Sequence, residues 1–328
     1  MNTNLYTLIC NMPTYLIIEL ISYLYGVIAL YHAWSNGAKY IKIYFYSIVG
    51  GIINDHIFML LPNSNTFWHS NNLIMLSNRM PLYIVFIYNL IIYPAFVLSS
   101  NMHHNKNLSL YYLYTSTIHS LIGSFIYALY DYTGVKFIWW VWHTTDKTII
   151  NRWGGVPYSS TCWTLVHILS FSILYYIKPI YTILLTTPLM MLLMTLSMLP
   201  FNQIGISDKI TLIFILSVYS CIVILYNILN HNTLNHNTSS RKKTKNNNIL
   251  LLIVLYFIYC LLVINLFFDP SMHKSFGEYQ MTGSSKYKEL DINGYYRNKY
   301  LSYNDSFVSF DIINYSDNIS KYTIRGLK

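Results

Sequence analysis

Carboxylates embedded in apolar sequence are the groups of this chain that are best placed to carry out chemistry. The first 207 of the 328 residues contain only four acidic residues, which are Glu19, Asp55, Asp131 and Asp146. Among apolar side chains a carboxyl group is costly to ionise, so its pKa rises and it can act as a general acid near neutral pH. We expect Asp131 or Glu19 to donate a proton in this way.

The densest cluster of reactive side chains lies in residues 139–158. His143 and Asp146 are three residues apart, so on one helical turn they could hydrogen-bond and relay a proton. Arg152 could neutralise Asp146, and the Gly-Gly-Val-Pro sequence at 154–157 predicts a turn. The alternative is an interfacial loop whose tryptophans only anchor it at the membrane surface.

Polar residues recur at helical spacing around the acids. Ser47 and Gly51 precede Asp55 at steps of four, and small residues at this spacing allow helices to approach closely. A longer ridge with the same step consists of Thr115, His119, Gly123, Tyr127 and Asp131. These ridges predict polar helix faces turned toward the interior of a bundle. A single histidine such as His167 could instead be a hydrogen-bonded packing residue.

We therefore predict an intramembrane site built from two sets of side chains. The residues expected to act on a substrate are Glu19, Asp55, Asp131, His143, Asp146 and Arg152. The residues expected to line the site are His32, Trp34, Trp68, His69, His119, Trp140, Trp142 and His167. The sequence contains no closely spaced histidine box, paired aspartate motif or glycine-rich nucleotide loop, so we expect neither a metal nor a cofactor.

Membrane-spanning helices must position these residues. The chain is 54% hydrophobic and 10% charged, whereas a typical soluble domain has about 25% charged residues. Stretches of about 20 apolar residues, long enough to cross a membrane, occur near 14–34, 40–62, 81–100, 109–131, 160–178, 180–200, 209–229 and 249–268. The predicted fold is an all-α polytopic transmembrane helix bundle of about 8 spans, or 7 if one helix of the fifth and sixth is re-entrant.

The distribution of polar residues divides the chain into parts. We expect an N-terminal tail at 1–13, a polar-cored membrane domain at 14–178, apolar membrane helices at 179–268 and a soluble, partly disordered tail at 269–328. A basic, low-complexity and disordered loop at 230–248 separates the last two helices. The last three predicted spans contain neither an acid nor a histidine, so any chemistry is expected in the first five.

The net charge of +9 indicates attraction to anionic lipids, because the basic residues are dispersed except in that loop. The expected partners are membrane lipids and a hydrophobic small molecule, and not nucleic acid. The chain is expected in the plasma membrane or an endomembrane, with its basic residues divided evenly between the two sides so that they predict no orientation.

Several motifs of the first half occur together. They are His32-Ala33-Trp34, Phe67-Trp68-His69, Arg79-Met80-Pro81-Leu82, Tyr130-Asp131 and Trp140-Val141-Trp142-His143 followed by Thr145-Asp146. In this combination the chain resembles an uncharacterised family of eukaryotic multi-pass membrane proteins, a domain of unknown function. That family has a proline after the aspartate and an Asp-Arg pair further on, where this chain has Lys147 and Asn151-Arg152.

A weaker similarity reaches the carotenoid-pathway membrane hydratases. It is carried by Trp142, Gly155-Val156-Pro157 and Trp163. The similarity implies protonation of an isoprenoid double bond followed by addition of water.

Three functions are consistent with these features. The first is acid–base chemistry on a lipid or isoprenoid substrate in an intramembrane cavity, with aromatic faces stabilising a cationic intermediate. The second is a proton-coupled transporter or channel, because buried ionisable residues also mark proton pathways. The third is a non-catalytic scaffold in which polar residues only support helix packing. Convergence of the acids on one cavity favours the first function.

Overall fold

The computed structural model describes residues 5–61, 67–100, 110–142, 146–231, 245–276, 286–291, 295–299, 310–313 and 323–326. The helices in these ranges are α1 (Leu5–Asn11), α2 (Pro13–Asn36), α3 (Ala38–Leu60), α4 (Ile84–Ser99), α5 (Tyr111–Lys136), α6 (Lys147–Ile150), α7 (Tyr158–Ile177), α8 (Tyr181–Gln203), α9 (Asp208–His231) and α10 (Asn247–Phe267). Each apolar stretch of the sequence contains one of the eight longer helices.

Six of these helices are long and apolar enough to cross a membrane, namely α2, α3, α7, α8, α9 and α10. The apolar helix α4 has 16 residues, which at 1.5 Å per residue is shorter than a hydrocarbon core of about 30 Å. The 26-residue helix α5 is long enough, but its apolar sequence includes buried hydroxyl groups and His119. The chain is therefore a helical bundle with six apolar spanning candidates, and the count of eight spans stays a prediction.

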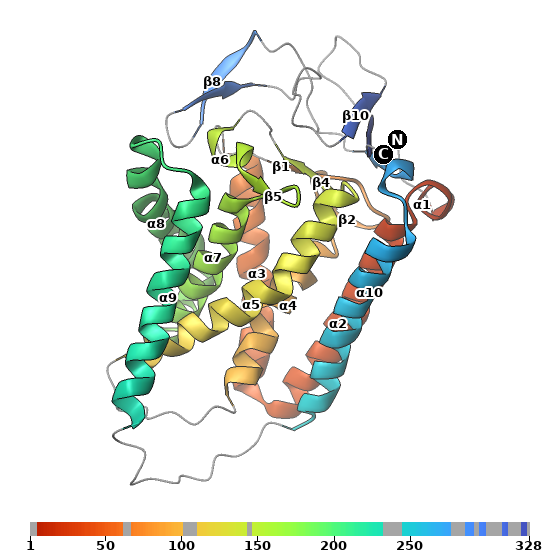
Figure 1. Ribbon diagram of the computed structural model, residues 1–328. Helices are drawn as coiled ribbons and strands as arrows, with labels where there is room; N and C mark the ends of the chain where they lie inside the picture. Colours follow the sequence, from red (N-terminus) through yellow and green to blue (C-terminus); the bar gives the residue numbers. More distant parts are fainter. Residues whose placement is uncertain are drawn as a thin grey trace.

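Helices distant in the sequence pack side by side. In Figure 1, α10 (blue) runs next to α2 (red), while α8 and α9 (green) lie on the other side of the bundle. Between these two groups lie the central helices, of which α5 packs on both α4 and α7. In consequence the last three long helices do not form a unit of their own, because α10 packs on α2 and α8 packs on α3 and α7.

Glycines allow the central helices to approach closely, as the spacing of small residues predicts. A Cβ atom on Gly123 of α5 would lie 2.0 Å from the carbonyl oxygen of Ile91 on α4. A Cβ atom on Gly51 of α3 would lie 2.2 Å from the Tyr88 ring of α4. Both positions therefore require a residue without a side chain, and Gly51 makes the space that Tyr88 occupies.

Short antiparallel ladders cover one end of the bundle (Figure 1). They pair β1 (Phe67–His69) with β4 (Trp140–Trp142), β2 (Met75–Ser77) with β3 (Met80–Pro81), and β5 (Arg152–Trp153) with β6 (Val156–Pro157). The register places His69 opposite Trp140. Gly154 and Gly155 have φ angles of 52° and 88°, so the predicted turn at 154–157 is present in the conformation that glycine favours.

The C-terminal segment contains five short strands. They are β7 (Lys274–Phe276), β8 (Lys288–Leu290), β9 (Tyr296–Asn298), β10 (Phe310–Ile313) and β11 (Thr323–Gly326), which form a hairpin of β8 with β9 and a sheet in the order β10-β11-β7. The expected disordered loop at 230–248 overlaps α9 and α10 at its two ends, and 232–244 lie outside the described residues.

Candidate functional site

A cavity of about 310 Å³ lies inside the bundle at the end covered by β1, β4 and α6. Helices α3, α4, α5, α7 and α8 supply the rest of its lining. The aromatic residues among the lining side chains are Phe58, Phe67, Tyr88, Tyr127, Tyr130, Trp140, Trp142 and Trp163. A cavity with such walls favours an apolar or cationic ligand and excludes a strongly hydrated one.

Polar side chains gather on one part of this wall. The Tyr88 hydroxyl donates to Asp55 Oδ1 at 2.5 Å, and His69 Nε2 lies 3.2 Å from Asp55 Oδ2. Asn54 Nδ2 donates to the Tyr88 hydroxyl at 2.9 Å, and the Thr187 hydroxyl donates to Asn54 Oδ1 at 3.3 Å. Three helices and one strand thus hold the Asp55 carboxylate in a fixed orientation.

The hydrogen bonds of Asp55 assign the tautomer of His69. Oδ1 accepts from the Tyr88 hydroxyl, and Oδ2 lies within hydrogen-bond distance of Nε2 as a second acceptor. The hydrogen of the neutral imidazole is then on Nε2, and Nδ1 is left as an acceptor. Nδ1 is buried and has no partner among the described residues. An aspartate that orients a histidine whose other nitrogen is free forms the base of many hydrolytic and isomerising sites.

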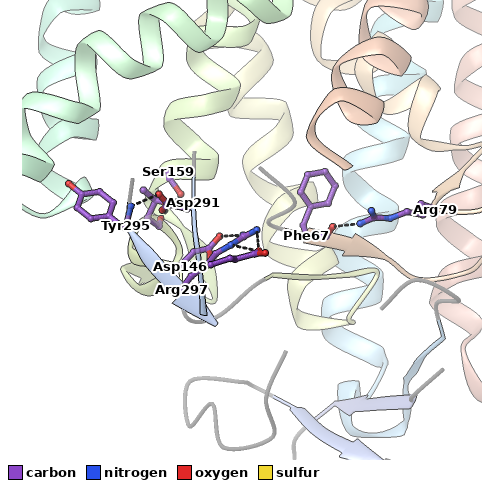
Figure 2. A network of polar contacts seen from close by, with 9 residues as sticks. Phe67, Arg79, Asp146, Ser159, Asp291, Tyr295 and Arg297 are labelled. Atoms are coloured by element: carbon purple, nitrogen blue, oxygen red, sulfur yellow. Dashed lines mark hydrogen bonds and ion pairs between the residues drawn. The ribbon is translucent and has the colours of Figure 1, made fainter. Parts of the chain in front are cut away.

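The β1–β4 ladder and two aromatic rings hold His69 in place. Its backbone pairs with that of Trp140, and its ring meets those of Phe67 and Trp140 edge to face at 5.3 and 6.2 Å between centroids. The imidazole is therefore shielded from water by rings that also line the cavity. The Arg79 guanidinium fixes the start of β1, because it donates to the carbonyl oxygens of Phe67 and Met59 (Figure 2).

Helix α8 supplies a methionine wall that the sequence analysis did not single out. Met190, Met191, Met194 and Met198 all line the cavity. Three of them are spaced by four residues, so they share one face of α8, and this spacing is the signal that could have revealed them. Methionine side chains are flexible and polarisable, so such a wall adapts to ligands of varied shape.

A second buried acid borders the cavity. Asp131 on α5 accepts a hydrogen bond at 2.7 Å from Ser160, which lines the cavity. The other oxygen of this carboxylate is buried and has no partner among the described residues. His167 lies nearby in the same wall, because its ring stacks on Trp163 at 5.0 Å and meets the Tyr88 ring at 5.5 Å.

Glu19 has a structural position outside the cavity lining. Its carboxylate accepts hydrogen bonds from the backbone N–H groups of Leu73 and Ile74, at 3.0 and 2.9 Å, and from the Tyr23 hydroxyl at 2.7 Å. Each oxygen of the Glu19 side chain thus accepts at least one hydrogen bond from the protein. The contacts fasten the segment before β2 to α2.

Asp146 is paired with a residue far along the chain and not with Arg152, as the sequence analysis expected. Arg297 on β9 donates to both Asp146 oxygens, at 3.2 and 2.9 Å (Figure 2). Burial raises the pKa of Asp146 to about 7, and the Arg297 guanidinium opposes that rise. Arg152 instead donates to the carbonyl oxygens of Ile149 and Gly155, and burial lowers its pKa to about 10. Proximity in sequence was therefore a poor guide to the partner.

The remaining expected site residues are dispersed. His32 contacts the Tyr93 hydroxyl and Asn247, and His119 lies between the hydroxyls of Ser99 and Ser172. Of the fourteen expected residues, the ones that line the cavity are Asp55, His69, Trp140 and Trp142. Asp131 and His167 lie directly behind lining residues, and those placed elsewhere are Glu19, His32, Trp34, Trp68, His119, Asp146 and Arg152. His143 lies outside the described residues.

Within the described ranges, no group of three or more histidine, cysteine or acidic side chains is arranged to hold a metal ion.

The fold and cavity together define a class: multi-pass helical membrane proteins with an apolar cavity and a polar network in its wall. The chain belongs to the family described as domain of unknown function DUF7802, whose family model matches residues 2–187. No curated protein and no solved structure matches the chain. The matched region includes Asp55, His69 and Tyr88, whereas the whole methionine wall and Arg297 lie beyond it.

Proposed function

We propose that this integral membrane protein binds an apolar, lipid- or isoprenoid-like molecule in its cavity and carries out acid–base chemistry on the polar end of that molecule. One observation supports the proposal above all others. The Asp55–His69 pair lies in a largely apolar wall, and the free Nδ1 of His69 is buried there without a protein partner among the described residues.

In this proposal His69 is the base. Its Nδ1 takes a proton from a ligand hydroxyl, or from a C–H group made acidic by a neighbouring carbonyl. The O–H or C–H bond breaks, and its electron pair stays on the ligand, as an alkoxide or, for the C–H group, as an enolate on the neighbouring carbonyl oxygen. The proton bonds to Nδ1 to give an imidazolium, which the Asp55 carboxylate stabilises. Tyr88 and Asn54 keep Asp55 oriented. The surrounding aromatic rings exclude water and stabilise the positive charge of the imidazolium.

The size and position of the cavity support a ligand that comes from the bilayer. A volume of about 310 Å³ is small for a ligand pocket, since pockets commonly span about 300–1,000 Å³. It suits a short molecule or the terminal part of a longer chain. Thr195 of α8 is exposed on the outer face of the bundle and also lines the cavity, so the rest of a long chain would extend toward lipid.

The proposal also includes the number of membrane spans. With α4 and α5 counted as spans enclosed by the six apolar helices, the bundle has the eight spans that the sequence predicts. Asp55, Tyr88 and Asp131 then lie within the bundle and not in contact with acyl chains, which limits the cost of burying them.

The test uses Asp55→Asn and His69→Gln in cells that produce the protein, with apolar extracts compared by mass spectrometry. We expect production of the wild type to convert one apolar species, and each variant to slow that conversion about 100-fold or more, as loss of a general base does. The matched control is His56→Gln. His56 follows Asp55 on α3, but its ring bonds to the Ile52 carbonyl oxygen and does not line the cavity.

Two other outcomes would contradict the proposal. Unchanged extracts with normally produced variants would exclude acid–base chemistry at His69.

The transporter alternative is favoured by the buried ridge of α5, which runs from Thr115 through His119 to Asp131. Proton uptake by protein-containing liposomes that Asp131→Asn abolishes, together with unchanged lipid extracts, would identify transport.

A further inference from the structure

A buried ion pair ties the C-terminal hairpin of β8 and β9 to the bundle. Arg297 on β9 is 2% exposed and Asp146, the residue before α6, is fully buried. Figure 2 shows the guanidinium pointing at the carboxylate, and Nη1 donates to both of its oxygens. The pair joins residues that are 151 positions apart, so it is a long-range tie between the tail and the bundle.

A second carboxylate orients the guanidinium within the hairpin. The register places Glu289 of β8 opposite Arg297 of β9. Arg297 Nε and Nη2 both donate to Glu289 Oε1, at 3.1 and 2.7 Å. This contact is internal to the hairpin, whereas the contact with Asp146 crosses to the bundle. Because the guanidinium fork is rigid, Glu289 directs the remaining donors toward Asp146.

The hairpin also contacts the first residue of α6. Lys147 Nζ lies 4.1 Å from the centroid of the Tyr295 ring, a cation–π contact. Tyr295 is itself held by Asp291, whose carboxylate accepts from the Tyr295 N–H at 2.8 Å (Figure 2). Two successive residues at the start of α6, Asp146 and Lys147, are thus held by the tail.

Helix α6 connects this tie to the cavity. The Asp146 carbonyl oxygen accepts from the Ile149 N–H at 2.9 Å. Thr148 and Ile149 both line the cavity. The Thr148 carbonyl oxygen accepts from the hydroxyl of Ser159 at 2.6 Å, and Ser159 also lines the cavity. A displacement of Asp146 would therefore move a wall of the cavity, although none of the tail residues that the structure describes lines it.

We propose that Arg297 is a positioning residue, which by holding Asp146 fixes α6 and so sets the shape of the cavity wall. The C-terminal hairpin is then a control element for ligand binding. This inference rests on the proposed function, because it takes the cavity as the place where the ligand binds.

The test measures hydrogen exchange and ligand labelling in the full-length protein in nanodiscs. The probe is hexadecanol that carries a photoreactive diazirine in its chain. In Arg297→Gln we expect the Ile149 amide to exchange about tenfold faster, because a charge-assisted contact no longer opposes local opening. We also expect severalfold weaker labelling of cavity peptides. Arg297→Lys keeps the charge but not the fork, so it should recover only part of both signals.

A double variant separates positioning from a merely structural role. Arg297→Gln alone leaves the buried Asp146 carboxylate without its cation. Asp146→Asn combined with Arg297→Gln removes that carboxylate as well. The double variant should therefore regain thermal stability while α6 still exchanges fast. Glu289→Gln is the matched control. Its amide oxygen can still accept from Arg297 and keep the guanidinium directed at Asp146, so exchange at α6 should stay within about twofold of the wild type.

Each outcome has a defined reading. If α6 exchange is unchanged in Arg297→Gln, or if the double variant restores exchange and stability together, the inference is wrong. If Arg297→Gln does not fold, Asp146→Asn decides the question, since it removes the ion pair across to the bundle while Glu289 still pairs with the buried Arg297. Unchanged exchange there overturns the inference. Absence of probe from the wild-type cavity would contradict the proposed function, while the exchange measurement would still test the tie.

Discussion

At the scale of single residues, two buried histidines illustrate how hydrogen-bond partners separate packing from function. Both are at most 1% exposed, and both rings stack on an aromatic neighbour, His119 on Phe96 and His167 on Trp163. His119 has a partner for each nitrogen, Ser99 at 2.5 Å and Ser172 at 3.0 Å. Neither nitrogen of His167 has a partner among the described residues. A buried polar group in that state costs free energy unless a bound molecule satisfies it.

Substitution by phenylalanine should therefore affect the two histidines in opposite ways. His119→Phe keeps the stacking but removes the hydrogen bonds of the imidazole to Ser99 and Ser172, and we expect a loss of about 2 kcal/mol in the free energy of unfolding. His167→Phe removes unsatisfied nitrogens and should leave stability unchanged or raise it. Thermal unfolding midpoints of the two purified variants compare them directly. Equal destabilisation by both would mean that His167 has a polar partner in the membrane, such as water or the ligand.

At the scale of elements, Glu19 joins the segment before β2 to α2 through backbone N–H groups. We expect Glu19→Gln to speed hydrogen exchange at the Leu73 and Ile74 amides and to cost about 2 kcal/mol of stability, because an amide offers one acceptor oxygen in place of two. Tyr23→Phe removes a single contact with this carboxylate and is the milder control. Loss of substrate conversion at full stability in Glu19→Gln would instead restore Glu19 as the proton donor that the sequence suggested.

The elements were predictable to different degrees. Apolar stretches of about 20 residues locate the long helices, because the length of a span and its hydropathy are both local properties of the sequence. The strand β1 has no such signal, since it consists of three residues and pairs with β4 across more than 70 positions. The same difference holds in the site. The sequence pattern identified Asp55 and His69 separately. They meet in one hydrogen-bond network because the β1–β4 ladder positions His69 and because Gly51 makes room for Tyr88.

At the scale of the whole molecule, the ion pair of Arg297 with Asp146 ties the C-terminal hairpin to the bundle. The composition of residues 269–328 predicts a soluble tail, and no local pattern shows that Arg297 is buried against Asp146. Long-range ion pairs of this kind depend on tertiary structure and on the burial of each charge, so sequence spacing could only suggest the neighbouring Arg152. The pair gives the stability of the whole chain a specific dependence on pH.

Asp146 should make the folded chain more stable in mild acid than at neutral pH. Its pKa rises from 3.8 to about 7 on folding, mainly because of burial. The Arg297 guanidinium lowers the pKa, whereas the carboxylates of Asp291 and Glu289 raise it further. The folded chain therefore binds this proton more tightly than the unfolded chain. The contribution of Asp146 to stability is largest below about pH 4 and declines by a few kcal/mol as the pH rises to about 7.

The difference in unfolding midpoint between the wild type and Asp146→Asn should follow this decline and then level off. In Arg297→Gln the decline should extend to higher pH, because the cation that lowers the pKa is gone. A difference that stays constant from pH 4 to 8 would show that Asp146 is not buried against the tail.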